Sequence, residues 1–184
     1  MKNRCIVLAA LGTLNTAGCM ADEPSSDSDQ PVSAVVDIDQ DITATVVGYH
    51  QIVNLRYNQC MDAPNGTLNV VLKLSNCTSS TTQGWTFVAA SSPNTFFLVN
   101  QRSGYCAEVN NGTNIPGELV DQWYCDGSMA EQWVQSYRTI GGVTYHQYTH
   151  AGTNLCLDTV SGPGSQLMQW YCDSYNDAQT WLVR

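Results

Sequence analysis

The 184 residues include 16 acidic and only 7 basic side chains, so the formal net charge is −9, and Lys and Arg form no cluster. Binding to nucleic acid or to anionic lipid surfaces is therefore not expected, because both depend on basic patches. Only 12% of residues are charged, so much of the surface must be Asn, Gln, Ser and Thr, which suits neutral, hydroxyl-rich partners.

The N-terminus has the pattern of an export signal, which we place over residues 1–19. Lys2 and Arg4 form a basic start, residues 5–14 form a short apolar core, and small residues follow. This apolar core is too short to remain as a membrane-spanning helix. Export would place the rest of the chain in an oxidising compartment, where cysteines can pair.

Cys19 would be an odd thiol in a secreted protein unless it is removed or modified. The letters TAGC (16–19) resemble a bacterial lipobox, in which cleavage before the cysteine exposes it for lipidation, although Thr16 replaces the usual Leu. The alternative is plain secretion with cleavage near Ala21. We therefore expect a secreted protein or a cell-envelope lipoprotein, which would contact a membrane only through a lipid on Cys19.

Residues 20–47 differ in composition from the rest of the chain. The stretch 21–41 carries seven acidic residues and no basic one, and Pro, Ser and Asp are prominent. Such a composition is typical of a chain that cannot bury a core. We predict an acidic flexible linker.

From residue 48 onward the chain is a threefold repeat. Trp85, Trp133 and Trp181 are each 48 residues apart, and the letters QWYCD at 122–126 return at 169–173. Two series of cysteines recur at similar intervals of 46 to 50 residues: Cys60, Cys106 and Cys156, and then Cys77, Cys125 and Cys172. Self-similarity at a fixed period is the mark of a repeat architecture. We predict one domain over 48–184, with repeats at about 48–94, 95–142 and 143–184.

The repeating unit is predicted to be all-β. Short runs rich in β-branched and aromatic residues, such as 51–55, 95–100, 118–124 and 143–149, are separated by Gly, Asn, Pro and Ser. No helical period of apolar residues persists for three turns. Three such units could stack in a row or close around an axis, and we favour closure because it removes exposed strand edges.

The repeat also suggests how the cysteines pair. Six cysteines allow 15 connectivities, but each unit contains two, which favours one disulfide within each repeat. The predicted disulfides are Cys60–Cys77, Cys106–Cys125 and Cys156–Cys172. A metal site is not expected, because the sequence has no C-x-x-C pair and its histidines show no ligand spacing. No cofactor is expected either.

These motifs resemble the ricin B-type lectin family, whose fold is the β-trefoil. Each unit reads Cys-x-Asp or Cys-x-Glu, then a second cysteine, then Gln-x-Trp or a variant of it: CMD, CAE and CLD, then LSNC, QWYC and QWYC, then QGW, EQW and QTW. The resemblance covers 48–184. It implies a six-stranded barrel capped by three hairpins and a carbohydrate-binding function.

The five tryptophans fall into two classes. Trp85, Trp133 and Trp181 occur once in every unit, as expected for core positions. Trp123 and Trp170 have Ser75 as their counterpart in the first unit, so we interpret them as exposed platforms for sugar rings. The alternative is that they only cover the neighbouring disulfides.

The resemblance implies that the acid of Cys-x-Asp and the Gln of Gln-x-Trp hydrogen-bond sugar hydroxyls. The third unit is best equipped, with Asp158, Trp170 and Gln179. The second unit has Trp123 and Asp121, but it carries Glu108 and Glu131 where the family has Asp and Gln. The first unit keeps Asp62 and Gln83 but has Lys73 and Ser75 in place of a platform, and we expect it to be silent. The alternative reading of the three Cys-x-Asp acids is that they cap local turns.

Glycans or polysaccharides are therefore the expected partners. The second function considered is a β-trefoil that binds protein, as an inhibitor or a toxin's accessory chain, with degenerate sugar sites. An enzyme is not expected, because the paired carboxylates are explained by repeat positions and no Ser/His/Asp or Cys/His motif is visible.

Overall fold

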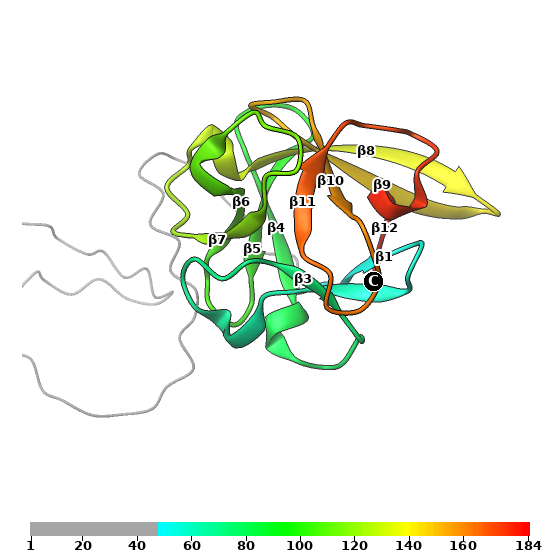
Figure 1. The fold of residues 1–184 in the computed structure, drawn as a ribbon, viewed down its shortest axis with the longest axis horizontal. Helices are drawn as coiled ribbons and strands as arrows, with labels where there is room; N and C mark the ends of the chain where they lie inside the picture. The colour runs from blue at the N-terminus through cyan, green and yellow to red at the C-terminus, as the bar shows by residue number, and fades with distance from the viewer. Residues whose placement is uncertain (1–47) are drawn as a thin grey trace, which may run out of the picture. The chain divides into compact units, whose positions relative to one another are not determined.

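The computed structural model describes residues 48–184, which form an all-β structure of twelve strands with five single-turn 3-10 helices (Figure 1). The predicted export signal, Cys19 and the acidic linker lie outside the described residues. Within the described residues, no helix is both long and apolar enough to cross a membrane.

Six strands form a closed barrel in which each strand pairs antiparallel with the next. They are β1 (Ile52–Asn54), β4 (Trp85–Ala89), β5 (Thr95–Asn100), β8 (Gln132–Ile140), β9 (Val143–His150) and β12 (Trp181–Val183). A bridge between His50 and Trp85 closes the ring, with two backbone hydrogen bonds of 2.8 Å. The predicted closure is confirmed, and it leaves the barrel strands paired on both sides.

Three hairpins complete the fold, one for each repeat. They are β2 (Gln59–Asp62) with β3 (Lys73–Ser75), β6 (Cys106–Val109) with β7 (Val120–Trp123), and β10 (Cys156–Thr159) with β11 (Leu167–Trp170). Each hairpin pairs with one barrel strand, and isolated bridges join the hairpins to one another: Val71–Asp121, Lys73–Gln166 and Leu119–Met168. The predicted β-trefoil with three pseudo-symmetric repeats is confirmed.

The 3-10 helices also follow the repeat. Three of them end two residues before the tryptophans that recur every 48 residues. They are η2 (Thr81–Gln83), η4 (Met129–Glu131) and η5 (Asp177–Gln179). Two others follow the first strand of a hairpin: η1 (Pro64–Gly66) and η3 (Asn110–Gly112). Asn65 and Asn111 have φ of 63° and 55°, a left-handed conformation that Asn tolerates better than most side chains.

The three repeated tryptophans form the centre of the core, as predicted. The side chains of Trp85, Trp133 and Trp181 are fully buried. Each indole nitrogen donates a hydrogen bond to the carbonyl of the residue between the cysteine and the acid of Cys-x-Asp. These acceptors are Met61 at 3.1 Å, Ala107 at 2.9 Å and Leu157 at 3.4 Å. A buried indole N–H needs such a partner, so the same bond recurs in each repeat.

The three disulfides are those predicted, Cys60–Cys77, Cys106–Cys125 and Cys156–Cys172. Each begins on the first strand of a hairpin and ends just beyond its second strand, so it closes the hairpin covalently. Loops of this length contribute about 3 kcal/mol each in the chain-entropy model.

Candidate functional site

Three surface pockets lie at equivalent positions in the three repeats. Each is lined by the acid of Cys-x-Asp together with residues of the 3-10 helix that precedes the core tryptophan or of the turn into it. We call them the first-repeat pocket (Asp62, about 570 Å³), the second-repeat pocket (Glu108, about 420 Å³) and the third-repeat pocket (Asp158, about 430 Å³).

The hairpin register determines which side chains accompany each acid. Directly opposite the three acids lie Lys73, Asp121 and Met168. Opposite the first cysteine of each repeat lie Ser75, Trp123 and Trp170. The predicted equivalence of these three positions is therefore present in the strand pairing.

In the third-repeat pocket an exposed indole and a carboxylate lie together. Trp170 is 42% exposed and lines the same pocket as Asp158, with Arg56 and Asn176. The indole packs against the backbone of Gly117, where an added Cβ would be 3.4 Å from the ring. A loop of the second repeat thus supports the ring while much of it remains accessible.

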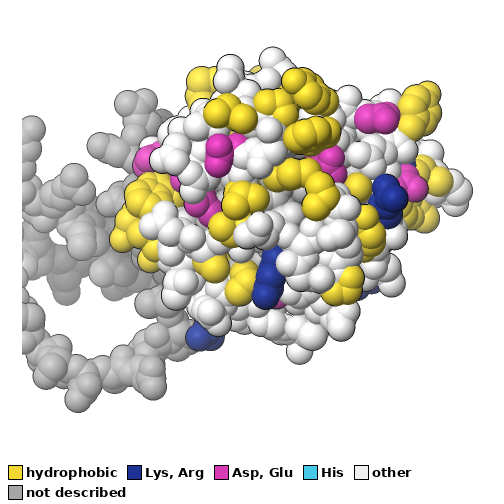
Figure 2. Space-filling model, in the orientation of Figure 1, with side chains coloured by type: hydrophobic (Ala, Val, Ile, Leu, Met, Phe, Trp, Pro, Cys, Tyr) yellow, Lys and Arg dark blue, Asp and Glu magenta, His cyan; other side chains and the backbone are white. Residues whose placement is uncertain are grey.

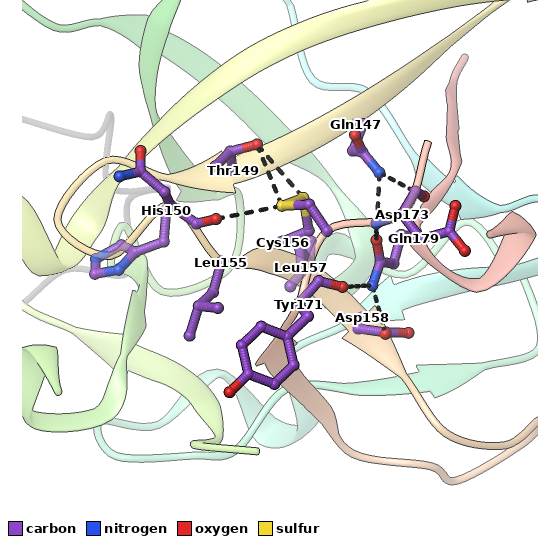
Figure 3. Close-up of a disulfide and its surroundings, with 12 residues drawn as sticks. Gln147, Thr149, His150, Leu155, Cys156, Leu157, Asp158, Tyr171, Asp173 and Gln179 are labelled. Atoms are coloured by element: carbon purple, nitrogen blue, oxygen red, sulfur yellow. Dashed lines mark hydrogen bonds between the residues drawn. A yellow bond between two sulfur atoms is a disulfide. The ribbon is translucent and has the colours of Figure 1, made fainter. Parts of the chain in front are cut away.

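Gln179 positions the carboxylate of this pocket (Figure 3). It is fully buried, and its Nε2 donates to Asp158 Oδ2 and to the Tyr171 carbonyl, both at 2.8 Å, while its Oε1 accepts from Asp173 N. Burial raises the pKa of Asp158, and the hydrogen bonds from Gln179 and from Thr159 N oppose that rise. Gln179 therefore acts through Asp158, because it does not line the pocket.

The second-repeat pocket has a different charge arrangement. Glu108 and the half-buried Trp123 line it, but Glu131 replaces the buried glutamine. Both Glu131 oxygens accept backbone hydrogen bonds at 3.1 Å, from Asp126 N and Gly127 N. Burial raises the pKa of Glu108 and of Glu131 to about 7, and the charges of Asp121 and Glu131 add to the effect on Glu108.

Asp121 does not line the second-repeat pocket. Its side chain is 1% exposed, and its Oδ2 accepts a hydrogen bond of 2.7 Å from Asn110 Nδ2. Burial raises the pKa of Asp121, and the bond from Asn110 opposes the rise. The predicted residues of this unit are thus divided, with Glu108 and Trp123 at the pocket and Asp121 buried next to it in the hairpin.

The first-repeat pocket contains no aromatic side chain. Asp62 lies beside Lys73 and Arg102, and the remaining lining residues are Pro64, Asn65, Ser80, Thr81 and Thr82. Gln83 is buried as Gln179 is, and its Nε2 lies 3.4 Å from Asp62 Oδ2. The amide that holds the acid is therefore present in the first and third repeats and absent from the second.

The family model of the ricin-type β-trefoil lectin domain matches residues 48–181. The chain belongs to this lectin family. The family's fold supports carbohydrate binding in general, and the family is non-enzymatic. No curated protein sequence matches the chain.

Solved structures show the same lectin fold at low sequence identity. A designed threefold-symmetric protein, ThreeFoil, has a TM-score of 0.67 and 20% identity over 74% of this chain and 97% of its own. A ricin B-like lectin from Macrolepiota procera, in complex with lactose, has a TM-score of 0.59 and 19% identity over 77% of this chain and 97% of its own. An exo-β-1,3-galactanase from Clostridium thermocellum has a TM-score of 0.67 and 19% identity, over 76% of this chain but only 30% of its own.

The glutamine of QWYCD has a role in the lectin domain that sequence reasoning missed. Gln122 and Gln169 are fully buried. Gln169 Nε2 donates to the carbonyls of Thr113 and Ile115, and Gln122 Nε2 donates to that of Thr67. Each glutamine thus ties its hairpin to a loop of the preceding repeat. The repetition of the glutamine together with the tryptophan and cysteine was the available signal.

Proposed function

We propose that this protein is an exported lectin that holds sugar units in the shallow pockets of its second and third repeats. A sugar ring would stack on Trp170 or Trp123 while the carboxylate of Asp158 or Glu108 accepts its hydroxyl hydrogen bonds. The observation that carries this proposal is the presence of an accessible indole and a carboxylate in one pocket, with Trp170 42% exposed and Asp158 beside it.

The chemistry of the third-repeat pocket matches a sugar. One face of a pyranose presents C–H bonds, which pack on an aromatic plane. A carboxylate can accept two neighbouring hydroxyls through charge-assisted hydrogen bonds, which are stronger than neutral ones. Asn176 also lines the pocket, and its Oδ1 accepts from Ala178 N at 3.0 Å, which orients its amide group.

Shallow pockets of this kind should bind single sugars weakly. Two pockets on one rigid domain would strengthen binding to a polysaccharide, because the second contact is intramolecular once the first has formed. The three disulfides are typical of proteins that function outside a reducing cytoplasm. Both features fit a secreted or surface-displayed protein that meets extended glycans.

A glycan array probed with the full chain, with free sugar as competitor, tests the proposal. We expect Trp170→Ala to remove most binding and leave the fold intact. Tyr175→Ala is the matched control, since Tyr175 is 88% exposed in the same repeat and does not line the pocket. Binding that free sugar cannot displace, or equal losses in the two variants, would favour the protein-binding alternative instead.

A further inference from the structure

We infer that the first-repeat pocket is not silent but binds an anionic sugar unit, such as a uronic acid. This inference rests on the proposed saccharide-binding function and adds a third site with a different ligand class. The pocket is the largest of the three, at about 570 Å³, and it has lost the aromatic platform. Two cations line it instead, Lys73 and Arg102.

The charge of this pocket stands out against the rest of the molecule. The whole chain has a net charge of −9, and only five of its seven Lys and Arg residues lie in 48–184. Two of those five line the first-repeat pocket with one carboxylate, which gives a formal lining charge of +1. The second-repeat pocket is lined by two acids and no cation, and the third by one of each. Figure 2 shows only a few Lys and Arg side chains, scattered over the face that it draws, so cations are sparse on this surface.

Both cations are available to a ligand. Among residues 48–184 the ion pair found is that of Arg138 with Asp177, and neither Lys73 nor Arg102 forms one. Lys73 lies on β3, directly opposite Asp62 on β2, so strand pairing places it at the pocket. Arg102 comes from the second repeat, after β5, so the pocket spans two repeats.

Gly66 allows Arg102 to lie over this pocket. Gly66 has φ of +63°, and a Cβ added there would lie 2.5 Å from Arg102 Cγ. A larger residue would displace the arginine stem. At the equivalent Gly112 of the second repeat, an added Cβ would instead be 3.3 Å from the side chain of Ala130. The close approach of a cation to this glycine therefore distinguishes the first repeat from the second.

The remaining groups suit the hydroxyls of the same sugar. Asp62 is 9% exposed and lines the pocket, and its Oδ1 has no hydrogen-bond partner although the atom is buried. Because Oδ1 is sealed from solvent, a sugar hydroxyl would meet the part of the Asp62 side chain that lines the pocket, while the sugar's carboxylate or sulfate meets Lys73 and Arg102. Ser80 and Thr82 add hydroxyl groups to the lining.

The test compares methyl β-glucuronide with methyl β-glucoside, which differ at one carboxylate, by NMR titration of the full chain. We expect the glucuronide to bind about tenfold more tightly, with shifts at residues 62–66, 80–82 and 102, and to weaken several-fold in 0.5 M salt. Glucose 6-sulfate forms a second arm. Binding of either anion supports an anionic-sugar site, and the tighter one identifies the charged group.

Arg102→Gln should weaken glucuronide binding about fivefold. Arg184→Gln, the matched control that removes the same charge outside the pocket, should leave it unchanged. Equal affinity for glucuronide and glucoside, or equal losses in the two arginine variants, would overturn the inference. Because Trp170→Ala tests the neutral-sugar site separately, failure here is distinguishable from failure of the proposed function.

Discussion

The second- and third-repeat pockets are built on the same hairpin register, with a tryptophan opposite the first cysteine and an acid two residues further along. In the third repeat Gln179 donates a hydrogen bond to that acid, Asp158. In the second repeat the corresponding Glu131 has no proton to donate when ionised, and it lies near Glu108 as a like charge. Burial raises the pKa of both pocket acids, and the residue at this buried position, which lines neither pocket, separates them further: Gln179 opposes the rise at Asp158, whereas Glu131 adds to it at Glu108.

The comparison assumes that both pockets stand on equivalent scaffolds, and the core tryptophans test that assumption. Trp133→Ala and Trp181→Ala each remove a fully buried indole and its hydrogen bond to a hairpin carbonyl. We expect each to lower the free energy of unfolding by about 3–5 kcal/mol. Urea denaturation measures both values. A difference of more than about 2 kcal/mol between the variants would show that the repeats are not energetically equivalent.

Sugar binding should distinguish Trp170 from Trp123, the two tryptophans that line pockets. Trp170→Ala should reduce affinity about thirtyfold, or about 2 kcal/mol, because the best-equipped pocket loses its platform. Trp123→Ala should have a smaller effect, since Trp123 is half-buried and its pocket carries a less favourable acid. Isothermal titration with a bound glycan gives both affinities, and unfolding curves should show that neither variant loses the fold. The reverse order of effects would contradict the assignment of the third repeat as the main site.

Glu131→Gln should convert the second repeat into the arrangement of the third. The pKa of Glu131 is raised from 4.5 to about 7 in the folded state. A carboxyl group with a raised pKa contributes its stability fully below pH 4.5, and this contribution is lost as the pH rises toward 7. At pH 8 we therefore expect the glutamine variant to be more stable than the parent by about 1 kcal/mol.

The pH dependence provides the control for that experiment. At pH 4 the parent and Glu131→Gln should have similar stability, because the glutamate is then mostly protonated in both folded and unfolded chains. Gln179→Glu is the matched reverse exchange, and it should introduce into the third repeat the same loss of stability with rising pH. A stability gain for Glu131→Gln that is constant from pH 4 to pH 8 would show that packing, not charge, is responsible.

The period of the tryptophans and cysteines predicted the threefold closure, the disulfides and the core, because each is repeated three times, and the family resemblance implied the six-stranded barrel. The pockets depend on residues that break the symmetry. Asp121 was expected at the sugar, yet it is buried against Asn110. Arg102 lies 29 positions beyond Lys73 in the sequence, and only the folded chain brings the two cations to one pocket. The spacing of the repeats does not show which side chains of neighbouring repeats will lie in the same pocket.

The smallest expected effect is the pH dependence of sugar binding at the second-repeat pocket. Glu108 accepts hydroxyl hydrogen bonds best as an anion, and its pKa is raised to about 7. Raising the pH from 6 to 8 should therefore strengthen binding there by about threefold, less than the change in ionised fraction because the neutral acid can still form hydrogen bonds. NMR titration of the Trp123 indole signal, in a Trp170→Ala background, isolates this pocket.

In Glu131→Gln the pH dependence of sugar binding should shift to lower pH, since an amide donor favours the Glu108 anion as Gln179 favours that of Asp158. An unchanged profile in that variant would mean that burial and the Asp121 charge, and not Glu131, control the charge of Glu108.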